Sequence, residues 1–260
     1  MQRLAEIAPG VLAATAGFAT TTSTVVTAPD GGCLVIDPAV SVADLAGIAA
    51  DLAAAGLEPR AGFATHPHWD HVLWSAALGD VPRYAAAAAA ASFPATRDHA
   101  VRELEETAPG HDLDLFGRLA GLPADAAAIP WDGPAAQLIV HDGHAPGHGA
   151  VFLPDAGVLV AGDMLSDIEM PLLDTGAADP LGDYRAGLEQ LAGLTGVRLL
   201  VPGHGHLGDG AEFRRRVDAD RRYLDLLAAG QPFSDPRAAS GWLLDHHRTQ
   251  LAVVAGRSGS

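Results

Sequence analysis

The sequence contains no lysine, a single cysteine (Cys33) and no apolar run long enough to cross a bilayer. One cysteine excludes an intramolecular disulfide and a metal site built on paired thiolates. Because Cys33 lies in an apolar segment, we expect it to be a small buried side chain. The first residues also lack the basic and then apolar pattern of a secretory signal. We therefore expect a cytoplasmic protein with no membrane partner.

Basic residues are scarce as well, since 16 arginines stand against 32 acidic residues and give a formal net charge of -16. Such a charge repels phosphate backbones, which argues against nucleic acid as a partner and favours a small-molecule substrate. The 260 residues are 48% apolar, enough for a sizeable core, and we predict one domain over residues 1–260. The oligomeric state stays open, a homodimer included.

Strand and helix patterns alternate along the chain, which favours an α/β fold. The predicted strands are residues 10–17, 22–29, 33–38, 61–65, 81–85, 135–142, 149–154, 157–163 and 197–203, and the predicted helices are residues 41–56, 72–79, 85–93, 180–194, 211–230 and 239–254. The turn-forming residues Asp30 and Gly31 predict a hairpin between the second and third strands. Ser41 is expected to cap a helix that Gly56 closes.

Residues 92–134 interrupt this alternation with charged segments of helical character, 96–106 and 112–121, separated by proline and glycine. A stretch of this size forms only a marginal core alone, so we interpret it as a helical insertion. The helices at about 210–255 are interpreted as a C-terminal addition to the same domain. The position of the insertion between two strand-rich halves makes it a candidate lid or specificity wall.

Four potential metal ligands, His66, His68, Asp70 and His71, occur within six residues. They follow a predicted strand and precede a predicted helix. Alternate residues of an extended segment point the same way, so His66 and His68 can converge on one ion. Asp70 and His71 lie where the chain turns and can face a second point, and Pro67 keeps the segment from being helical. The alternative is a set of surface histidines with a helix-capping aspartate, which this density of donors disfavours.

Three further candidate ligands, His148, Asp163 and His204, each follow a predicted strand. Polar residues at strand ends are where α/β proteins collect ligands and catalytic groups. Each also has a plainer interpretation, as a loop histidine for His148 or His204 and as a helix N-cap for Asp163. Their occurrence together, beside glycines that allow close backbone approach, favours one shared site.

These motifs resemble those of the metallo-β-lactamase superfamily. The resemblance rests on HPHWDH at 66–71, PGH ending at His148, GD ending at Asp163 and PGHGH containing His204. It implies a four-layer αββα sandwich of two similar halves with two metal ions at one edge. It also implies that His66, His68 and His148 bind the first ion, that Asp70, His71 and His204 bind the second, and that Asp163 bridges the two.

Imidazole and carboxylate donors without thiolate suit zinc, here two ions per chain, and also admit iron or manganese. A bridging carboxylate would hold two ions about 3.5 to 4 Å apart, with a shared hydroxide available near neutral pH. The predicted function is hydrolysis of a small ester, thioester or lactone by this metal-bridging hydroxide, and Asp70 is predicted to be catalytic as well as a ligand.

An alternative function stays open, because persulfide dioxygenases of the superfamily use one iron at positions equivalent to His66, His148 and Asp163. Lactonases of the superfamily carry a catalytic tyrosine where this chain has Ser166. Glyoxalase II relatives bind glutathione through a basic C-terminal region, and the tail here has arginines but no lysine. The sequence therefore does not select the substrate.

Several residues outside the ligand set also receive predictions. Asp37 is either a partner that orients a ligating histidine or a turn residue. Trp69 is expected to line the substrate pocket and Trp74 to pack in the core. His141 and His144 are expected at the surface, as are the other histidines outside the ligand set.

Overall fold

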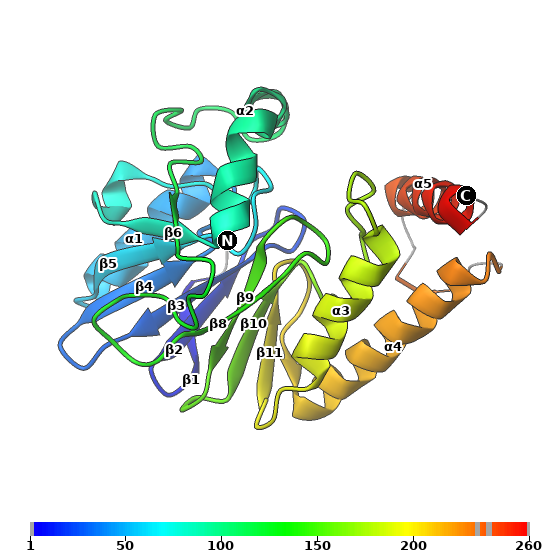
Figure 1. The fold of residues 1–260 in the computed structure, drawn as a ribbon. Helices are drawn as coiled ribbons and strands as arrows, with labels where there is room; N and C mark the ends of the chain where they lie inside the picture. The colour runs from blue at the N-terminus through cyan, green and yellow to red at the C-terminus, as the bar shows by residue number, and fades with distance from the viewer. Residues whose placement is uncertain (1–2, 232–234, 238–240, 259–260) are drawn as a thin grey trace.

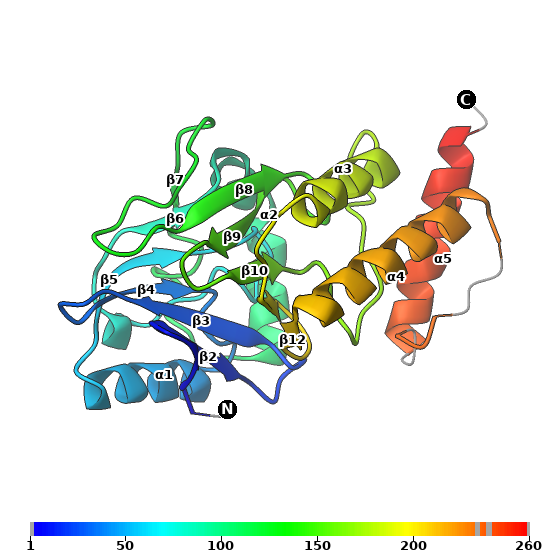
Figure 2. The same ribbon diagram turned by 90° about the horizontal axis from the view of Figure 1, so that it is seen from below.

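The computed structural model describes residues 3–231, 235–237 and 241–258, and it places two β-sheets between two layers of helices (Figures 1 and 2). Helices α1 and α2 lie on the side of the N-terminal sheet, whereas α3, α4 and α5 lie on the side of the C-terminal sheet. The predicted four-layer αββα sandwich is confirmed. Among the described residues, no helix is both long and apolar enough to cross a membrane.

The first sheet contains strands in sequence order. They are β1 (Ala5–Ala8), β2 (Val11–Thr15), β3 (Thr22–Thr27), β4 (Gly32–Ile36), β5 (Glu58–Phe63), β6 (Arg83–Ala85) and β7 (Ala120–Gly121). Pairs from β1 to β4 are antiparallel and pairs from β4 to β7 are parallel. The predicted hairpin is confirmed, because Thr27 pairs with Cys33 across a turn in which Gly31 has a φ of 86°.

The second sheet has the order β12-β11-β10-β9-β8. Its strands are β8 (Gln137–His141), β9 (His148–Leu153), β10 (Val158–Gly162), β11 (Leu199–Pro202) and β12 (Gly208–Asp209). Only β10 and β11 pair in parallel, and α3 (Pro180–Ala192) makes the crossover between them. The carboxyl ends of β10 and β11 therefore lie side by side, which brings the residues that follow them together.

The remaining helices agree with the sequence pattern at most positions. In α1 (Val42–Ala54) the hydroxyl of Ser41 accepts the N–H of Asp44, as expected of an N-cap. The C-terminal pair is α4 (Gly210–Ala228) and α5 (Gly241–Ser258). The predicted start of the last helix, at residue 239, lies outside the described residues.

The predicted helix at 72–79 is wrong, since only a short 3₁₀ turn, Ala76–Leu78, forms there. Val72, Leu73 and Trp74 are all buried in succession, so the chain runs through the core instead of presenting one face to it. Burial of Trp74 agrees with its predicted core role. The turn ends at Gly79, whose carbonyl accepts the indole N–H of Trp74 at 2.9 Å.

The region 92–134 also differs from its prediction. The segments 85–93 and 96–106 are one helix, α2 (Ala87–Thr107), which continues through Pro94 although proline cannot donate the N–H that would reach Ala90. The predicted helical segment 112–121 consists of turns that end in β7. Side chains of this region pack into the core on both faces of the first sheet, with Phe116 under the helices and Ile129 between the sheets.

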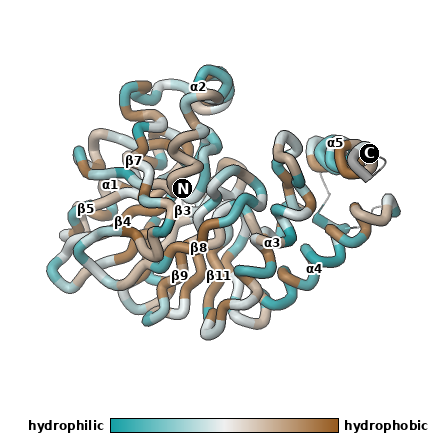
Figure 3. Tube along the Cα trace, viewed as in Figure 1, coloured by the Kyte–Doolittle hydropathy of each residue, from teal (hydrophilic) through white to brown (hydrophobic). Residues whose placement is uncertain are grey.

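Three apolar clusters fill the three interfaces of the sandwich. The first, with Val35, lies between the N-terminal sheet and α1 and α2, and the second, with Tyr184, lies between the C-terminal sheet and α3, α4 and α5. The third, with Phe63 and Val160, lies between the sheets. In Figure 3 the strands are mainly brown, whereas the outer helices carry teal segments. The candidate metal ligands predicted from the sequence therefore follow strands that are packed on both faces.

Candidate metal centre

Backbone hydrogen bonds tie together strand ends from both sheets at one edge of the sandwich. The N–H of Gly149 donates to Thr65 O at 2.7 Å and joins the start of β9 to the segment after β5. The N–H of Gly203 donates to Gly162 O at 2.6 Å and joins the ends of β11 and β10. The N–H of Thr22 donates to Gly203 O at 2.8 Å, which connects the two sheets. The loops that follow β5, β10 and β11 therefore begin close together, although they are far apart in the sequence.

A first group of potential ligands contains His66, His68, His144 and Asp163, with one donor atom from each lying within 4.8 Å of the others. His144 Nε2 lies 3.0 Å from His68 Nδ1 and 3.5 Å from Asp163 Oδ2. His66 Nε2 also lies 3.5 Å from Asp163 Oδ2. Three imidazoles and one carboxylate therefore surround one point, a donor set suited to a transition metal.

A second group contains Asp70, His71 and His204, whose donor atoms again lie within 4.8 Å of one another. His204 Nε2 is 3.1 Å from Asp70 Oδ2. Asp163 reaches this group too, with Oδ1 at 3.1 Å from His71 Nε2 and Oδ2 at 3.4 Å from His204 Nε2. The carboxylate of Asp163 thus stands between the two groups, where a bridging ligand is needed.

His148 does not belong to either group. Its Nε2 accepts the backbone N–H of Asp163 at 3.2 Å, so that lone pair already has a partner. Its ring stacks between His66 and His141, with centroids 5.2 Å and 4.6 Å apart. In this structure His148 therefore lies beside the first group and not within it, whereas the resemblance implied that it binds the first ion.

The prediction that His141 and His144 lie at the surface is wrong, because both are buried, and it is His144 that joins the first group where His148 was predicted. His144 is 5% exposed and lies in the loop between β8 and β9, with a φ of 79°. Its Nδ1 lies 2.9 Å from Leu172 O, which favours a proton on Nδ1 and a lone pair on Nε2, facing the group. His144 lies in a left-handed turn four residues before His148, and His148 is the first residue of β9.

Asp37 contacts His71, one of the candidate ligands, as the first of its two predicted interpretations requires. Its Oδ2 lies 2.9 Å from His71 Nδ1, on the side of the ring away from the centre. Both carboxylate oxygens also accept hydrogen bonds from Thr65, from the backbone N–H and from the hydroxyl. Asp37 has a φ of 46°, so the turn interpretation holds as well. The carboxylate fixes the orientation of His71.

Burial and charge shift the pKa values across the centre in opposite directions. Burial holds the pKa of His66 well below its ordinary value. Burial opposes protonation of His71 too, but Asp163 and Asp70 raise its pKa well above the ordinary value. The same carboxylates raise the pKa of His204 against the effect of burial. Burial disfavours ionised Asp70, yet His71 and His204 bring its pKa down to about 2. The two carboxylates are therefore ionised opposite protonated His71 and His204, and a bound metal ion would replace the positive charge of those two rings.

The residues present fit a pair of metal ions. The buried Nε2 of His66 has no hydrogen-bond partner in the described part of the chain, an unfavourable state that a bound ion would relieve. The two groups together offer five imidazoles and two carboxylates and no thiolate. That donor set suits zinc, iron or manganese, and the geometry alone does not choose among them.

Other residues near the centre have their own partners. His206 is exposed and its Nδ1 lies 2.9 Å from Asp167 Oδ2. Ser166, where related lactonases have tyrosine, is 6% exposed, and its hydroxyl accepts the N–H groups of Ile168 and Glu169. Trp69 is half-buried with its ring edge-on to Phe18 at 5.8 Å.

Comparison with known proteins gives one family. The sequence profile of the Metallo-beta-lactamase superfamily matches residues 16–204, which is more than half of the chain. A hydroxyacylglutathione hydrolase of Ruegeria pomeroyi is 31% identical over 169 residues, which are 64% of this chain and 56% of that protein. The corresponding enzyme of Rhodobacter capsulatus is 32% identical over 178 residues, 65% of this chain and 60% of that protein. The chain therefore matches less than two thirds of the length of either enzyme.

A probable metallo-hydrolase of Bacillus subtilis, YflN, is 26% identical over 196 residues, 63% of this chain and 74% of that protein. Among solved structures, a metallo-beta-lactamase family protein from Thermus thermophilus has a TM-score of 0.67 at 22% identity, covering 96% of this chain and 92% of that one. A beta-lactamase domain protein from Burkholderia ambifaria has a TM-score of 0.66 at 20% identity, covering 96% and 87%. At these identities the structural likeness concerns the fold.

Proposed function

Because the chain belongs to the metallo-β-lactamase superfamily, we propose that it is a dinuclear metal-dependent hydrolase that cleaves a small ester, thioester or lactone. The observation that carries the proposal is the position of Asp163, whose two carboxylate oxygens lie within 3.5 Å of histidine nitrogens from both ligand groups. One carboxylate between two imidazole groups is the arrangement that holds two ions close together.

The proposed ligand set differs in one residue from the set that the sequence implied. The first ion would be held by His66, His68 and His144, and the second by Asp70, His71 and His204, with Asp163 between them. We propose zinc, with iron or manganese as the other metals that these donors accept. Asp70 stays a proposed catalytic residue because its carboxylate belongs to the second group.

When bound, the pair of ions would supply Lewis acidity and make hydroxide available near neutral pH. The protein supplies orientation. Asp37 holds Nδ1 of His71 at 2.9 Å, which directs Nε2 toward the centre. Ala19 O lies 3.1 Å from Nδ1 of His204 and does the same for that ring. Such partners fix both the tautomer and the ring angle, so little motion is needed when a substrate arrives.

Thioesters are the first substrates to try. Two relatives at 31% and 32% identity are named hydroxyacylglutathione hydrolases, and their names refer to a thioester class. The net charge of -16 favours a small substrate over a phosphate polymer. The second group, Asp70, His71 and His204, can hold a second ion, which the single iron of the alternative persulfide dioxygenase does not require.

The test is metal quantification on protein purified without added metal, followed by assays with thioesters, esters and lactones. Two ions per chain and turnover of at least one of these classes support the proposal. One iron per chain, with oxygen consumed on a persulfide, would support the dioxygenase instead. Loaded protein that is inactive on all three classes would refute hydrolysis of this kind.

A further inference from the structure

The loop that follows the central aspartate has an unusual backbone. Leu165, two residues after Asp163, has a φ of 60°, in the left-handed region that is strained for a residue with a side chain. Such a conformation persists only where neighbouring groups hold it. The next carbonyls of the loop, Leu165 O and Ser166 O, both accept hydrogen bonds from buried arginines of the C-terminal part.

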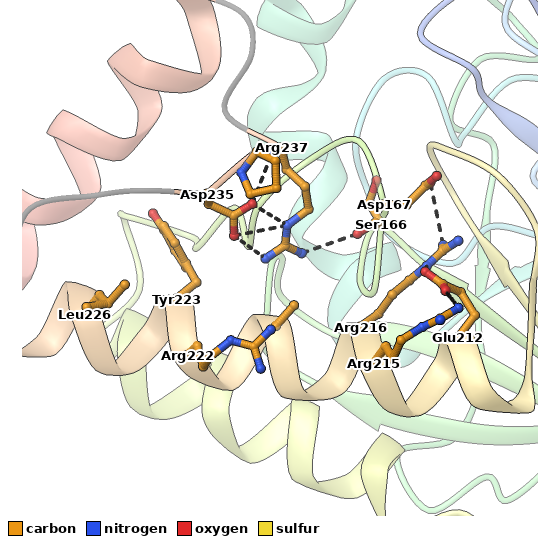
Figure 4. Close-up of a pocket in the computed structure, with 12 residues that line it drawn as sticks. Ser166, Asp167, Glu212, Arg215, Arg216, Arg222, Tyr223, Leu226, Asp235 and Arg237 are labelled. Atoms are coloured by element: carbon orange, nitrogen blue, oxygen red, sulfur yellow. Dashed lines mark hydrogen bonds and ion pairs between the residues drawn. The ribbon is translucent and has the colours of Figure 1, made fainter.

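Arg216, in α4, makes the more extensive contacts. Its side chain is 6% exposed, and Nη1 donates to Leu165 O at 3.1 Å while Nη2 donates to His206 O at 2.9 Å. Its Nε donates to Glu212 Oε1 at 3.0 Å, and Figure 4 shows the guanidinium between Glu212 and Asp167. Leu165 follows Asp163 by two residues and His206 follows His204 by two residues. One guanidinium therefore bridges the two loops that carry ligands from β10 and β11.

Asp167 closes this arrangement from the other side. Its Oδ1 accepts the N–H of His206 at 2.8 Å, its Oδ2 lies 2.9 Å from His206 Nδ1, and Oδ1 lies 3.6 Å from Nη1 of Arg216. Arg237 adds a further donor, from Nη1 to Ser166 O at 3.3 Å, and is itself paired with Asp235 and with buried Asp220.

These arginines line a cavity of about 400 Å³ beside α4, but their guanidinium groups already contact carbonyls and carboxylates. Arg216 and Arg237 therefore hold the loops of the protein in place, and few of their N–H groups are left to bind a ligand in the cavity. A planar guanidinium can donate in two directions at once, which an ammonium group on a flexible chain does less well. Removal of Arg216 would leave the buried carbonyl of Leu165 and the part-buried carbonyl of His206 without this donor, and the two loops could then move apart.

We propose that Arg216 is a positioning residue that sets the spacing between Asp163 and His204, and thereby the affinity of the chain for its second metal ion. The inference rests on the proposed function for the identity of the centre. A displacement of about 1 Å in a ligand is enough to impair a site of this kind, because coordination distances must be met within a few tenths of an ångström.

The test compares Arg216→Met with Arg215→Met. Arg215 is the neighbouring residue, 72% exposed, and it also pairs with Glu212, so both variants lose a contact to the same carboxylate. Metal affinities are measured by competition with a chromophoric chelator. We expect Arg216→Met to lose at least tenfold in affinity for the second ion, which depends on both Asp163 and His204, and to lose less for the first ion, which keeps three histidines, whereas Arg215→Met behaves as wild type. Equal affinities in all three proteins would overturn the inference.

Backbone amide exchange gives a readout that does not depend on metal. In chelated protein, Arg216→Met should exchange faster than Arg215→Met in the segments 164–168 and 204–208, and unchanged exchange there would also overturn the inference. If Arg216→Met fails to fold, Arg216→Lys keeps the charge and should show the same differences to a smaller degree. Wild type that binds fewer than two ions would contradict the proposed function, whereas the exchange comparison would still decide the role of Arg216.

Discussion

At the scale of single residues, two histidines four positions apart have different tasks. His144 Nε2 faces His68 and Asp163, whereas the corresponding nitrogen of His148 accepts the N–H of Asp163. A nitrogen whose lone pair already accepts a hydrogen bond is a poor ligand, since binding an ion would break that bond.

We predict that His144→Ala removes a ligand and lowers metal content and turnover, the latter by at least a hundredfold. His148→Ala should keep both ions and lose less than tenfold in turnover, because it removes a supporting ring and not a donor. Metal analysis by mass spectrometry and steady-state kinetics on both variants measure the difference. The reverse order of effects would restore His148 to the ligand set.

Cys33 offers a second test at this scale. It is completely buried, and burial raises the pKa of its thiol to about 12. Since the thiolate is the reactive form, native protein should resist a thiol reagent at pH 8 for hours, while the same protein in denaturant reacts at once. Rapid labelling of folded protein would show that the strand pairing around Cys33 opens readily.

The local cluster at 66–71 was predictable because its spacing alone places donors together. The choice between His144 and His148 was not, because it depends on where β9 begins and on the turn at His144. The contacts of Arg216 were equally out of reach. The contact with Leu165 joins residues 51 positions apart that come together only through the crossover at α3, and the contact with His206 depends on how α4 packs after β12.

At the scale of elements, the loop that carries His144 depends on close contact with α2. Gly147 has a φ of 65°, and a Cβ placed on it would lie 2.5 Å from the backbone nitrogen of Ala89, in the first turn of that helix. Helix backbone at that distance cannot shift without loss of stability. A residue larger than glycine at position 147 would therefore suffer both backbone strain from the left-handed φ and a steric clash with α2.

Gly56 separates the two penalties, since its φ of 68° is similar and nothing lies within 4 Å of its Cβ position. Gly56→Ala should lower the free energy of unfolding by about 1 kcal/mol, the cost of the left-handed conformation. Gly147→Ala should cost more than that and should weaken metal binding as well. Urea unfolding of both variants provides the comparison, and equal losses would mean that α2 yields to the extra methyl group.

Helices were predictable where the helical period dominated, as in α1 and α4, and β8 to β11 were predictable as short apolar runs bounded by turn-forming residues. Prediction failed at Val72–Trp74, because three buried residues in succession match neither the helical nor the strand period and lie next to alanines that favour a helix. It also failed at Pro94, because tertiary packing of Phe93 and Leu104 in the first cluster holds α2 together across the missing hydrogen bond.

At the scale of the whole molecule, the free energy of unfolding depends on pH through the protonation of the buried histidines. Burial lowers the pKa of His141 to about 4 and that of His144 to about 3. The unfolded chain titrates its histidines near pH 6.5, so between about pH 6.5 and 4 it takes up protons that the folded chain refuses. His71 and His204 have raised pKa values, so their effect on stability changes only above pH 6.5, outside this window.

The chelated protein should accordingly lose stability as the pH falls from about 6.5 to 4, by up to about 1.4 kcal/mol per pH unit for each such histidine. His141→Phe keeps an aromatic ring against His148, which lies 4.6 Å away, but cannot titrate, so its stability should fall less steeply over that range. The measurement is the free energy of unfolding in urea at pH 4.5, 5.5 and 6.5, with the same change at the exposed His246 as the control. If His141→Phe and wild type declined in parallel, His141 would take up its proton in the folded state. The imidazole stack behind the centre would then be open to water.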